Sequence, residues 1–456
     1  MQRSCSVPSS TAQVRRPLEG GEVPPYPAKP MPLAPRKDRD PLGWCLFITL
    51  GFLALLLWRV DLPGRYYFDE IHYVPASLKL LDLIPANREH PMFAKEVIAT
   101  SIHFLGDRPI GWRLPSALFG ALGLLGFGRL MWHASHRRAA TLAAMMLLAT
   151  NFMWFVQSRI AMLDMIEAGL CMVGLWQFAA ALRSGSKAAG RFRLLLSGLA
   201  LGLSIAAKWT SAPAVMLPGL CFLILWIREN GLTFAGRPKG GPVKGISLIE
   251  AAFWLGLFPL AVYWATYAPA MFYTDRPVSP FGFLKQHEYM LRLQESVKKP
   301  HPYRSVWYQW VGDLRVIWYL FETMKDTQRG IVMLGNPFSM MVGLLALLWG
   351  IGAAIYQKRH DVLAFVLLYA ATLGVWIYNA KPVQFYYHYL LPGAFLMGVL
   401  ALALDAMWAS KGRWQRVGTG TFVLALGFFV LFFPILSGLP LPKDVYNFWM
   451  WLPGWR

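Results

Sequence analysis

Residues 192–227 read FRLLLSGLALGLSIAAKWTSAPAVMLPGLCFLILWI, an apolar stretch that is interrupted near its middle by Lys208 and Pro213. About 20 helical residues cross a hydrocarbon core roughly 30 Å thick, so this stretch is too long for one crossing. A lysine in the middle of a bilayer is costly, and a proline cannot continue a helix unbroken. The stretch therefore predicts two membrane helices, 192–208 and 210–227, joined by a hairpin at Lys208-Trp209.

The composition extends this membrane character to the whole chain. Of its 456 residues 56% are hydrophobic and 15% are charged, and the mean hydropathy is +0.40. Soluble domains carry about 25% charged residues, so we exclude a soluble enzyme, a disordered protein and a nucleic-acid-binding domain. The net charge of +20 is assigned to Lys and Arg that flank membrane segments. The four cysteines show no CxxC spacing and predict neither a disulfide framework nor a metal site.

Apolar runs of spanning length recur along the chain and predict an all-α polytopic membrane protein. Residues 1–41, rich in Pro, Arg and Lys, are predicted to be a disordered basic tail, and we expect no cleavable signal peptide before the first span. The eleven predicted spans are about 42–59, 114–132, 138–157, 161–182, 192–208, 210–227, 248–268, 338–356, 360–378, 387–407 and 416–436.

The short basic loops predict the orientation of these spans. They fall on alternate loops without a break, which by the positive-inside rule makes them cytoplasmic. The N-terminus is then inside and the C-terminus outside, with two long, partly helical outer loops at 60–112 and 269–337. The basic segments are Arg36 to Arg39, His136 to Arg138, Arg183 to Arg193, Arg228 to Lys244, Lys358-Arg359 and Lys411 to Arg416.

The first outer loop contains two adjacent carboxylates, Asp69 and Glu70, among aromatic residues at the membrane surface. A solvated acidic pair is one interpretation. Neighbouring side chains point apart, so the pair is poorly suited to flank a sugar as glycosidase carboxylates do. One carboxylate acting as a base, with the other orienting it, fits the spacing better.

Further polar and aromatic clusters fall at the outer ends of the predicted spans. Each alone could be a headgroup anchor, because Lys and Arg snorkel and aromatic residues gather at interfaces. Together they predict one outer cleft for a substrate with a lipid tail and an anionic head. They are Glu89-His90-Pro91 with Lys95, Gly111-Trp112-Arg113, Ser158-Arg159 with Asp164, Lys208-Trp209, His301-Pro302-Tyr303-Arg304-Ser305 and Phe385-Tyr386-Tyr387-His388-Tyr389.

These motifs, together with Phe68-Asp69-Glu70-Ile71-His72 and Gly335-Asn336-Pro337, resemble those of the protein O-mannosyltransferases from about residue 42 to 440. The resemblance implies a GT-C fold with eleven spans and transfer of mannose from a polyprenyl phosphate to Ser or Thr of exported proteins. It divides the chain into a catalytic module at 42–268, a second outer loop at 269–337 and a C-terminal four-span region at 338–456. The family's usual His-Pro-Pro-Leu reads His90-Pro91-Met92-Phe93, and the loop at 269–337 is too short for a MIR domain, which suggests a bacterial relative.

The chemistry that the resemblance implies suits these residues. A phosphate is a good leaving group, so the acceptor hydroxyl needs a base, for which we choose Asp69 with Glu70 orienting. Cations would stabilise the departing phosphate, and we choose Arg159 and Lys208, with Arg304 and His388 as helpers. The transfer is expected to invert the anomeric centre and to need neither metal nor cofactor. Supporting or substrate-binding roles are expected for His72, His90, Lys95, Asp164, Trp209, His301, Tyr303 and Tyr387.

Two other readings stay open at this point. A GT-C relative could transfer another sugar or glycosylate a lipid or polysaccharide. A transporter is disfavoured, because transporters place ionisable residues near the bilayer midplane and often contain repeats. The expected partners are a polyprenyl-phosphate sugar, an exported acceptor protein and the lipids of the plasma or inner membrane, with no nucleic acid.

Overall fold

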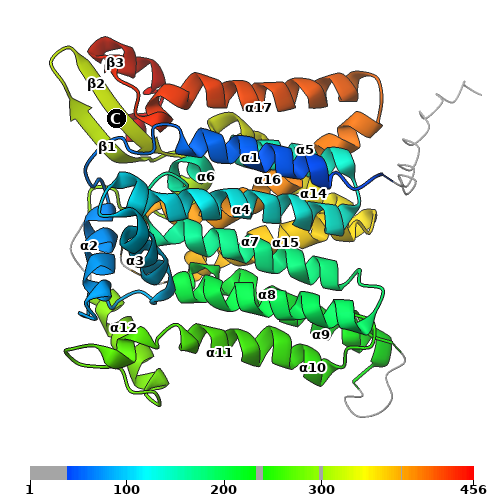
Figure 1. Ribbon diagram of the computed structural model, residues 1–456. Coiled ribbons are helices and arrows are strands. Elements are labelled where there is room, and N and C mark those ends of the chain that lie inside the picture. The colour runs from blue at the N-terminus through cyan, green and yellow to red at the C-terminus, as the bar shows by residue number, and fades with distance from the viewer. Residues whose placement is uncertain (1–37, 233–239, 297–300, 380, 382) are drawn as a thin grey trace, which may run out of the picture. The chain divides into compact units, whose positions relative to one another are not determined.

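The computed structural model describes residues 38–456 except 233–239, 297–300, 380 and 382. The predicted tail at 1–41 therefore lies almost entirely outside the described residues. Within the unit 36–456 the helices of the predicted membrane spans run side by side (Figure 1). These helices are α1 Leu42–Leu57, α4 Pro109–Ser135, α5 Arg138–Ala149, α6 Phe152–Gln157, α7 Leu163–Ala181, α8 Lys187–Ala207, α9 Ala212–Asn230, α10 Leu248–Ala252, α11 Phe258–Ala265, α14 Pro337–Tyr356, α15 His360–Tyr378, α16 Leu390–Ala409 and α17 Arg413–Ser437.

The all-helical membrane fold is confirmed. Among the described residues, 9 helices are long and apolar enough to cross a membrane, and two shorter apolar helices, α1 and α5, coincide with two further predicted spans. The count of eleven crossings stays a prediction. The predicted span 138–157 is divided into α5 and α6, because the Asn151 side chain accepts a hydrogen bond from Trp154 N and begins a new helix.

The hairpin predicted at Lys208 is present. Helix α8 ends at Ala207, and Lys208 is extended, with φ −161° and ψ 149°. A 3-10 turn, η1 (Trp209–Ser211), leads into α9, whose first turn contains Pro213. Proline is favoured there because its missing N–H has no partner in a first turn.

Helices α4 and α7 touch at glycines. A Cβ added to Gly123 would lie 2.8 Å from the Cα of Gly169, so the two backbones are in direct contact. Membrane helices associate closely through such small residues, since lipid supplies no hydrophobic force between them. This close contact makes the α4–α7 pair a rigid support for the polar residues at one end of the two helices.

The outer loops gather at one end of the unit. Helices α2 (Glu70–Leu81), α3 (Phe93–Leu105) and α12 (Phe283–Glu295) and the strands lie there (Figure 1). The short α13 (Trp307–Val311) lies between α12 and the first strand in the chain. The second loop also contains strands β1 (Ile317–Thr323) and β2 (Thr327–Met333), which pair antiparallel. A third strand near the C-terminus, β3 (Leu441–Pro442), pairs antiparallel with β2. We expected this loop to be partly helical. The hairpin was not predicted, although β-branched and aromatic residues favour strands.

The basic loops gather at the opposite end (Figure 1). Arg129 pairs with Asp40, Arg137 pairs with Asp405, and Arg183 Nε donates to the carbonyl of His133 at 3.2 Å. These contacts agree with the alternation of basic loops along the sequence. That this end faces the cytoplasm stays a prediction.

Candidate active site

Asp69 stands at the N-terminal end of α2, directly after a strained residue. Phe68 has φ 49°, a left-handed conformation that is uncommon for a bulky side chain, and its ring stacks on Tyr319 with centroids 4.1 Å apart. Such strain costs about 1–3 kcal/mol and persists only where the surroundings enforce it. Among the residues that the structure describes, the half-buried Asp69 carboxylate accepts no hydrogen bond. It is therefore available to a substrate.

Glu70 is fully buried and points away from Asp69 into the protein. Its carboxylate binds Arg113 through both oxygens, at 2.8 and 2.9 Å, and accepts from the backbone N–H groups of Ala161 at 3.0 Å and Tyr67 at 3.2 Å. The remaining N–H groups of Arg113 donate to carbonyl oxygens of residues 60–65. A buried carboxylate with this many partners anchors the backbone. It is well placed to orient Asp69 through the chain and poorly placed to touch an acceptor.

The guanidinium of Arg159 binds backbone carbonyl groups, which the sequence did not indicate. Its guanidinium donates to the carbonyl oxygens of Leu56 at 2.7 Å and Trp58 at 2.8 Å, at the C-terminal end of α1. The last carbonyls of a helix lack internal partners, and a cation satisfies them. Arg159 therefore caps α1, and this geometry disfavours the phosphate-binding role we expected for it.

Lys208 and Asp164 lie close enough to Asp69 for their charges to act on it. Lys208 Nζ is 2.7 Å from Asp164 Oδ1 and 4.8 Å from the ring centroid of Tyr387. Both charged groups are almost completely buried. An ammonium has three donors, so the ion pair with Asp164 leaves Lys208 able to bind a further acceptor.

The surroundings of Asp69 change the pKa of its carboxyl. Burial raises the pKa of its carboxyl to about 6, although the positive charges of Lys208 and His72 oppose that rise and Asp164 adds to it. A general base works best when its pKa is close to the working pH. At neutral pH this carboxylate is ionised and more basic than an ordinary aspartate.

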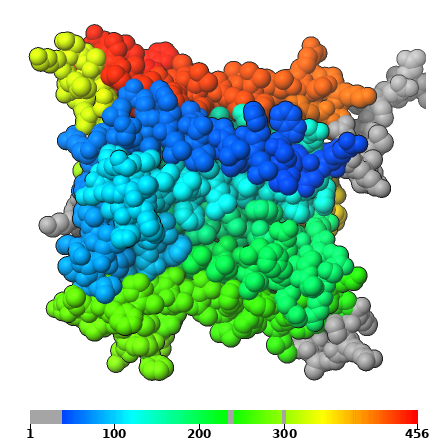
Figure 2. All heavy atoms as spheres, viewed as in Figure 1, coloured from blue at the N-terminus to red at the C-terminus, as the bar shows by residue number. Residues whose placement is uncertain are grey.

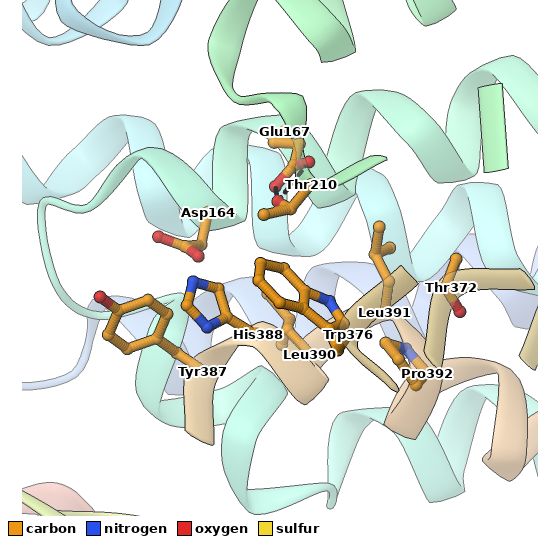
Figure 3. A pocket seen from close by; sticks show the side chains of 10 residues that line it. All are labelled: Asp164, Glu167, Thr210, Thr372, Trp376, Tyr387, His388, Leu390, Leu391 and Pro392. Carbon is orange, nitrogen blue, oxygen red and sulfur yellow. Dashed lines mark hydrogen bonds between the residues drawn. The ribbon is translucent and has the colours of Figure 1, made fainter. Parts of the chain in front are cut away.

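A narrow pocket continues from Asp164 into the membrane region. Figure 3 shows Asp164 beside the rings of Tyr387 and His388, and Glu167, one helical turn further along α7, bound to the Thr210 hydroxyl. The pocket encloses about 10 Å³, room for about one water molecule and too little for a hexose.

His388 presents a hydrogen-bond donor to this pocket. Its Nδ1 accepts from the backbone N–H of Phe385 at 3.1 Å, which puts the proton of the neutral ring on Nε2. The ring stacks on Trp376 with centroids 3.9 Å apart. This orientation suits a neutral donor to an anionic oxygen.

Two residues at the site were missed by the sequence analysis. Glu167 accepts from the Thr210 hydroxyl at 2.6 Å, and its spacing of three residues from Asp164 was the available signal. Lys381 lies in the connection before His388. Burial, and after it the charge of Lys208, lowers the pKa of Lys381 to about 8, so the two cations are close enough to act on each other.

The other predicted residues lie around this centre. Burial lowers the pKa of the His90 imidazole, and the positive charge of Lys208, which is close enough to act on it, lowers that pKa further. Lys95 is buried and donates to the carbonyl oxygens of Asn87 and His90. Trp209 turns away, stacking on His287 and donating to the Tyr263 hydroxyl.

The motif at 301–305 forms an outer rim. The ring of His301 lies edge-on to Phe385, with centroids 5.0 Å apart, and Phe385 stacks on Tyr387. Tyr303 is half-buried, and Arg304 is exposed and is not seen to contact Lys208 or Asp164. Within the described ranges no group of three His, Cys, Asp or Glu side chains is arranged to hold a metal ion.

Comparisons with known proteins agree with this architecture. Residues 107–272 match the family model described as dolichyl-phosphate-mannose-protein mannosyltransferase, and residues 281–455 match the C-terminal four-TMM region of protein O-mannosyltransferase. Two relatives are named polyprenol-phosphate-mannose–protein mannosyltransferase. The one from Mycolicibacterium smegmatis is 23% identical over 94% of this chain and 96% of its own length, and the one from Mycobacterium tuberculosis is 24% identical over 94% and 95%.

Solved structures share the fold. The Saccharomyces cerevisiae protein O-mannosyltransferase Pmt1-Pmt2 complex bound to the sugar donor matches with a TM-score of 0.77 at 14% identity, covering 92% of this chain and 93% of that one. ArnT from Cupriavidus metallidurans, bound to undecaprenyl phosphate, matches with a TM-score of 0.56 at 15% identity, covering 88% and 77%. Together with the family models, these matches show that the chain is a GT-C glycosyltransferase and belongs to the protein O-mannosyltransferase family.

Proposed function

We propose that this protein transfers a mannosyl residue from a polyprenyl phosphate to Ser or Thr hydroxyls of exported proteins, with inversion, at the outer face of the membrane. The names of the mycobacterial relatives support the donor and the protein acceptor. The observation that carries the mechanism is the unpaired Asp69 carboxylate, which lies within the electrostatic reach of the Lys208–Asp164 ion pair.

In this reaction Asp69 takes the proton of the acceptor hydroxyl as its oxygen attacks the anomeric carbon. The bond from that carbon to the phosphate oxygen breaks, and its electron pair leaves with the phosphate. A single displacement from the side opposite the phosphate inverts the anomeric centre. It requires one carboxylate base and no carboxylate nucleophile, which suits a site where Glu70 is held by Arg113 and Asp164 by Lys208.

We assign stabilisation of the departing phosphate to the cations and the neutral donor around the Lys208–Asp164 ion pair. Lys208 and Lys381 supply positive charge, and His388 Nε2–H supplies a neutral donor. Preorganised donors of this kind act where charge develops and need no reorganisation during the reaction. Arg304, on the exposed rim, is the remaining predicted helper.

The outer-face assignment rests on the two ends of the unit. Asp69, α2 and α3 lie at the end opposite the basic loops, and the positive-inside rule assigns those loops to the cytoplasm (Figure 1). The substrates that meet there are a lipid-linked sugar, held at the bilayer surface, and an exported chain.

The test is a reconstituted assay with polyprenyl-phosphate mannose, a Thr-containing peptide, a lipid acceptor and a polysaccharide acceptor. We expect mannosyl-peptide, with the anomeric configuration opposite to that of the donor by NMR. Labelling of the lipid or polysaccharide without labelling of any peptide would favour the other GT-C reading. Retention of configuration would contradict the single displacement.

A further inference from the structure

An open groove lies beside Asp69, outside the site described above. It encloses about 320 Å³ between one face of α2 and the segment that follows that helix. This volume is in the range of small-ligand sites. The residues that line it are Ile71, His72, Pro75, Ala76, Lys79, Ala86, Asn87 and Glu89.

The groove continues the helix face that begins with the base. Asp69, His72, Ala76 and Lys79 are spaced by three, four and three residues, which puts them in one row along α2. Ten residues of helix at about 1.5 Å each span about 15 Å. An extended peptide rises about 3.3 Å per residue, so this row matches about four to five residues.

The opposite wall is held in place from two sides. Lys95, buried beneath it, donates to the carbonyl oxygen of Asn87 at 2.5 Å, and Gln294 of α12 donates to that of Glu89 at 2.8 Å. Asn87 has φ 47°, a left-handed conformation, and its side-chain oxygen is buried without a hydrogen-bond partner in the described part of the chain. A wall fixed in this way keeps one shape, which lowers the ordering cost when a chain binds against it.

The other wall offers exposed side chains without hydrogen-bond partners among the described residues. His72 and Lys79 are exposed. Ile71, which lies between Asp69 and His72 in the sequence, is 54% exposed. The groove combines apolar surface, the exposed cation of Lys79 and the carboxylate of Glu89, which already accepts from Asn87 Nδ2 at 2.6 Å. This mixture suits a polypeptide better than an acyl chain or a uniformly hydroxylated glycan.

We propose that this groove binds four to five residues of the acceptor polypeptide in extended form, on one side of the acceptor Ser or Thr, with Lys79 favouring an acidic residue at the far end. The inference rests on the proposed function, because it assigns a protein acceptor to Asp69. It adds which surface binds the residues next to the acceptor Ser or Thr, and which charge on those residues that surface favours.

A charge-reversal experiment tests the contact directly. Peptides with one Thr carry Asp or Lys four residues before or after it, and KM is measured at saturating donor for the wild type, Lys79→Gln and Lys79→Glu. Exposed ion pairs are worth about 0.2–1 kcal/mol, or up to about fivefold. On one side of the Thr we expect the wild type to prefer Asp by about two- to fivefold, Lys79→Gln to show no preference, and Lys79→Glu to prefer Lys.

The matched control is Lys325→Glu, an equally exposed lysine between β1 and β2, which should keep the wild-type preference. A second measurement is peptide length: KM should fall as residues are added to that side of the Thr and level off after about five. An active enzyme whose charge preference is the same in the wild type and in Lys79→Glu overturns this inference alone. A wild type that labels no peptide at all overturns the proposed function, and this inference with it.

Discussion

Glu70 holds Arg113 with both carboxylate oxygens, at 2.8 and 2.9 Å, while its neighbour Asp69 faces the opposite way with no hydrogen bond within the described residues. Two adjacent carboxylates thus have opposite environments. Arg113 also binds carbonyl oxygens of the segment that leads to Phe68, so this ion pair fixes the strained turn. One carboxylate positions the backbone and the other is left for chemistry.

Replacing Asp69 should remove turnover while leaving the fold intact. Asp69→Asn keeps the shape but removes the basicity, and general-base loss costs about 10²–10⁴ in rate. We expect transfer to fall by that factor with donor affinity nearly unchanged, measured as initial rate and as donor binding. The matched control is Asp82→Asn, an exposed aspartate just after the same helix, which should keep the wild-type rate. Near-normal turnover in folded Asp69→Asn would show that another group is the base.

The rate should also depend on the protonation of Asp69. The base must be ionised, so kcat/KM should fall as the pH drops through its pKa of about 6, and stay high above it. Lys208 lowers this pKa, so in Lys208→Gln the fall should begin at a higher pH. The measurement is a pH profile of kcat/KM for both proteins. A profile flat down to about pH 4 in the wild type would remove Asp69 from this role.

Breaking the Glu70–Arg113 pair should affect stability first. Removing one partner of a buried pair leaves an uncompensated charge and costs about 3–5 kcal/mol. Glu70→Gln and Arg113→Met should each lower the apparent melting temperature in detergent, whereas Asp69→Asn should not. The double variant should be less destabilised than the sum of the two, because neither charge remains unpaired. Full stability in Glu70→Gln would contradict the anchoring role.

Substitution of Arg159 and substitution of Lys208 should have different effects on transfer rate and donor KM. Lys208→Gln should reduce the transfer rate by about 10²–10³, the cost of a lost oxyanion donor, and should also lower the melting temperature, because it leaves the buried Asp164 carboxylate without its partner. Arg159→Gln should lower the melting temperature, because the carbonyls at the end of α1 lose their donor, and change donor KM little. The opposite assignment of effects would return Arg159 to the phosphate site.

Chelators should leave the wild-type rate unchanged. The charge on the leaving phosphate is met by Lys208 and Lys381 in this mechanism, so no divalent cation is required. The measurement is initial rate after EDTA treatment and after addition of Mg²⁺ or Mn²⁺. A rate that is lost with EDTA and restored by one of these ions would contradict it.

Much of the fold could be predicted because a bilayer imposes a fixed length and apolarity on each crossing. The break at Lys208 and Pro213 could be seen for the same reason. The residues gathered at Asp69 were less predictable in their contacts. Lys208 and Asp164 could be chosen by their position at span ends, but nothing in the sequence pairs them.

The partners of Glu70 and Arg159 were not predictable at all. Arg159 binds backbone carbonyls about a hundred residues earlier in the chain, and every residue type has a carbonyl. Glu70 and Arg113 are an ordinary pair of residue types at an uninformative separation. Lys381 lies four residues before the Phe385–Tyr389 motif, but a single lysine near the end of a span is common and does not by itself indicate a site.

The contact of Gly123 with Gly169 has a consequence for how the site is positioned. Helix α4 carries Arg113, which holds Glu70 and thereby Asp69, and helix α7 carries Asp164, which holds Lys208. Close-packed backbones transmit strain instead of sliding, so these two helices move as one rigid body. The Asp69 carboxylate and the Lys208 ammonium, which we propose as base and phosphate cation, are then both positioned from one rigid pair of helices.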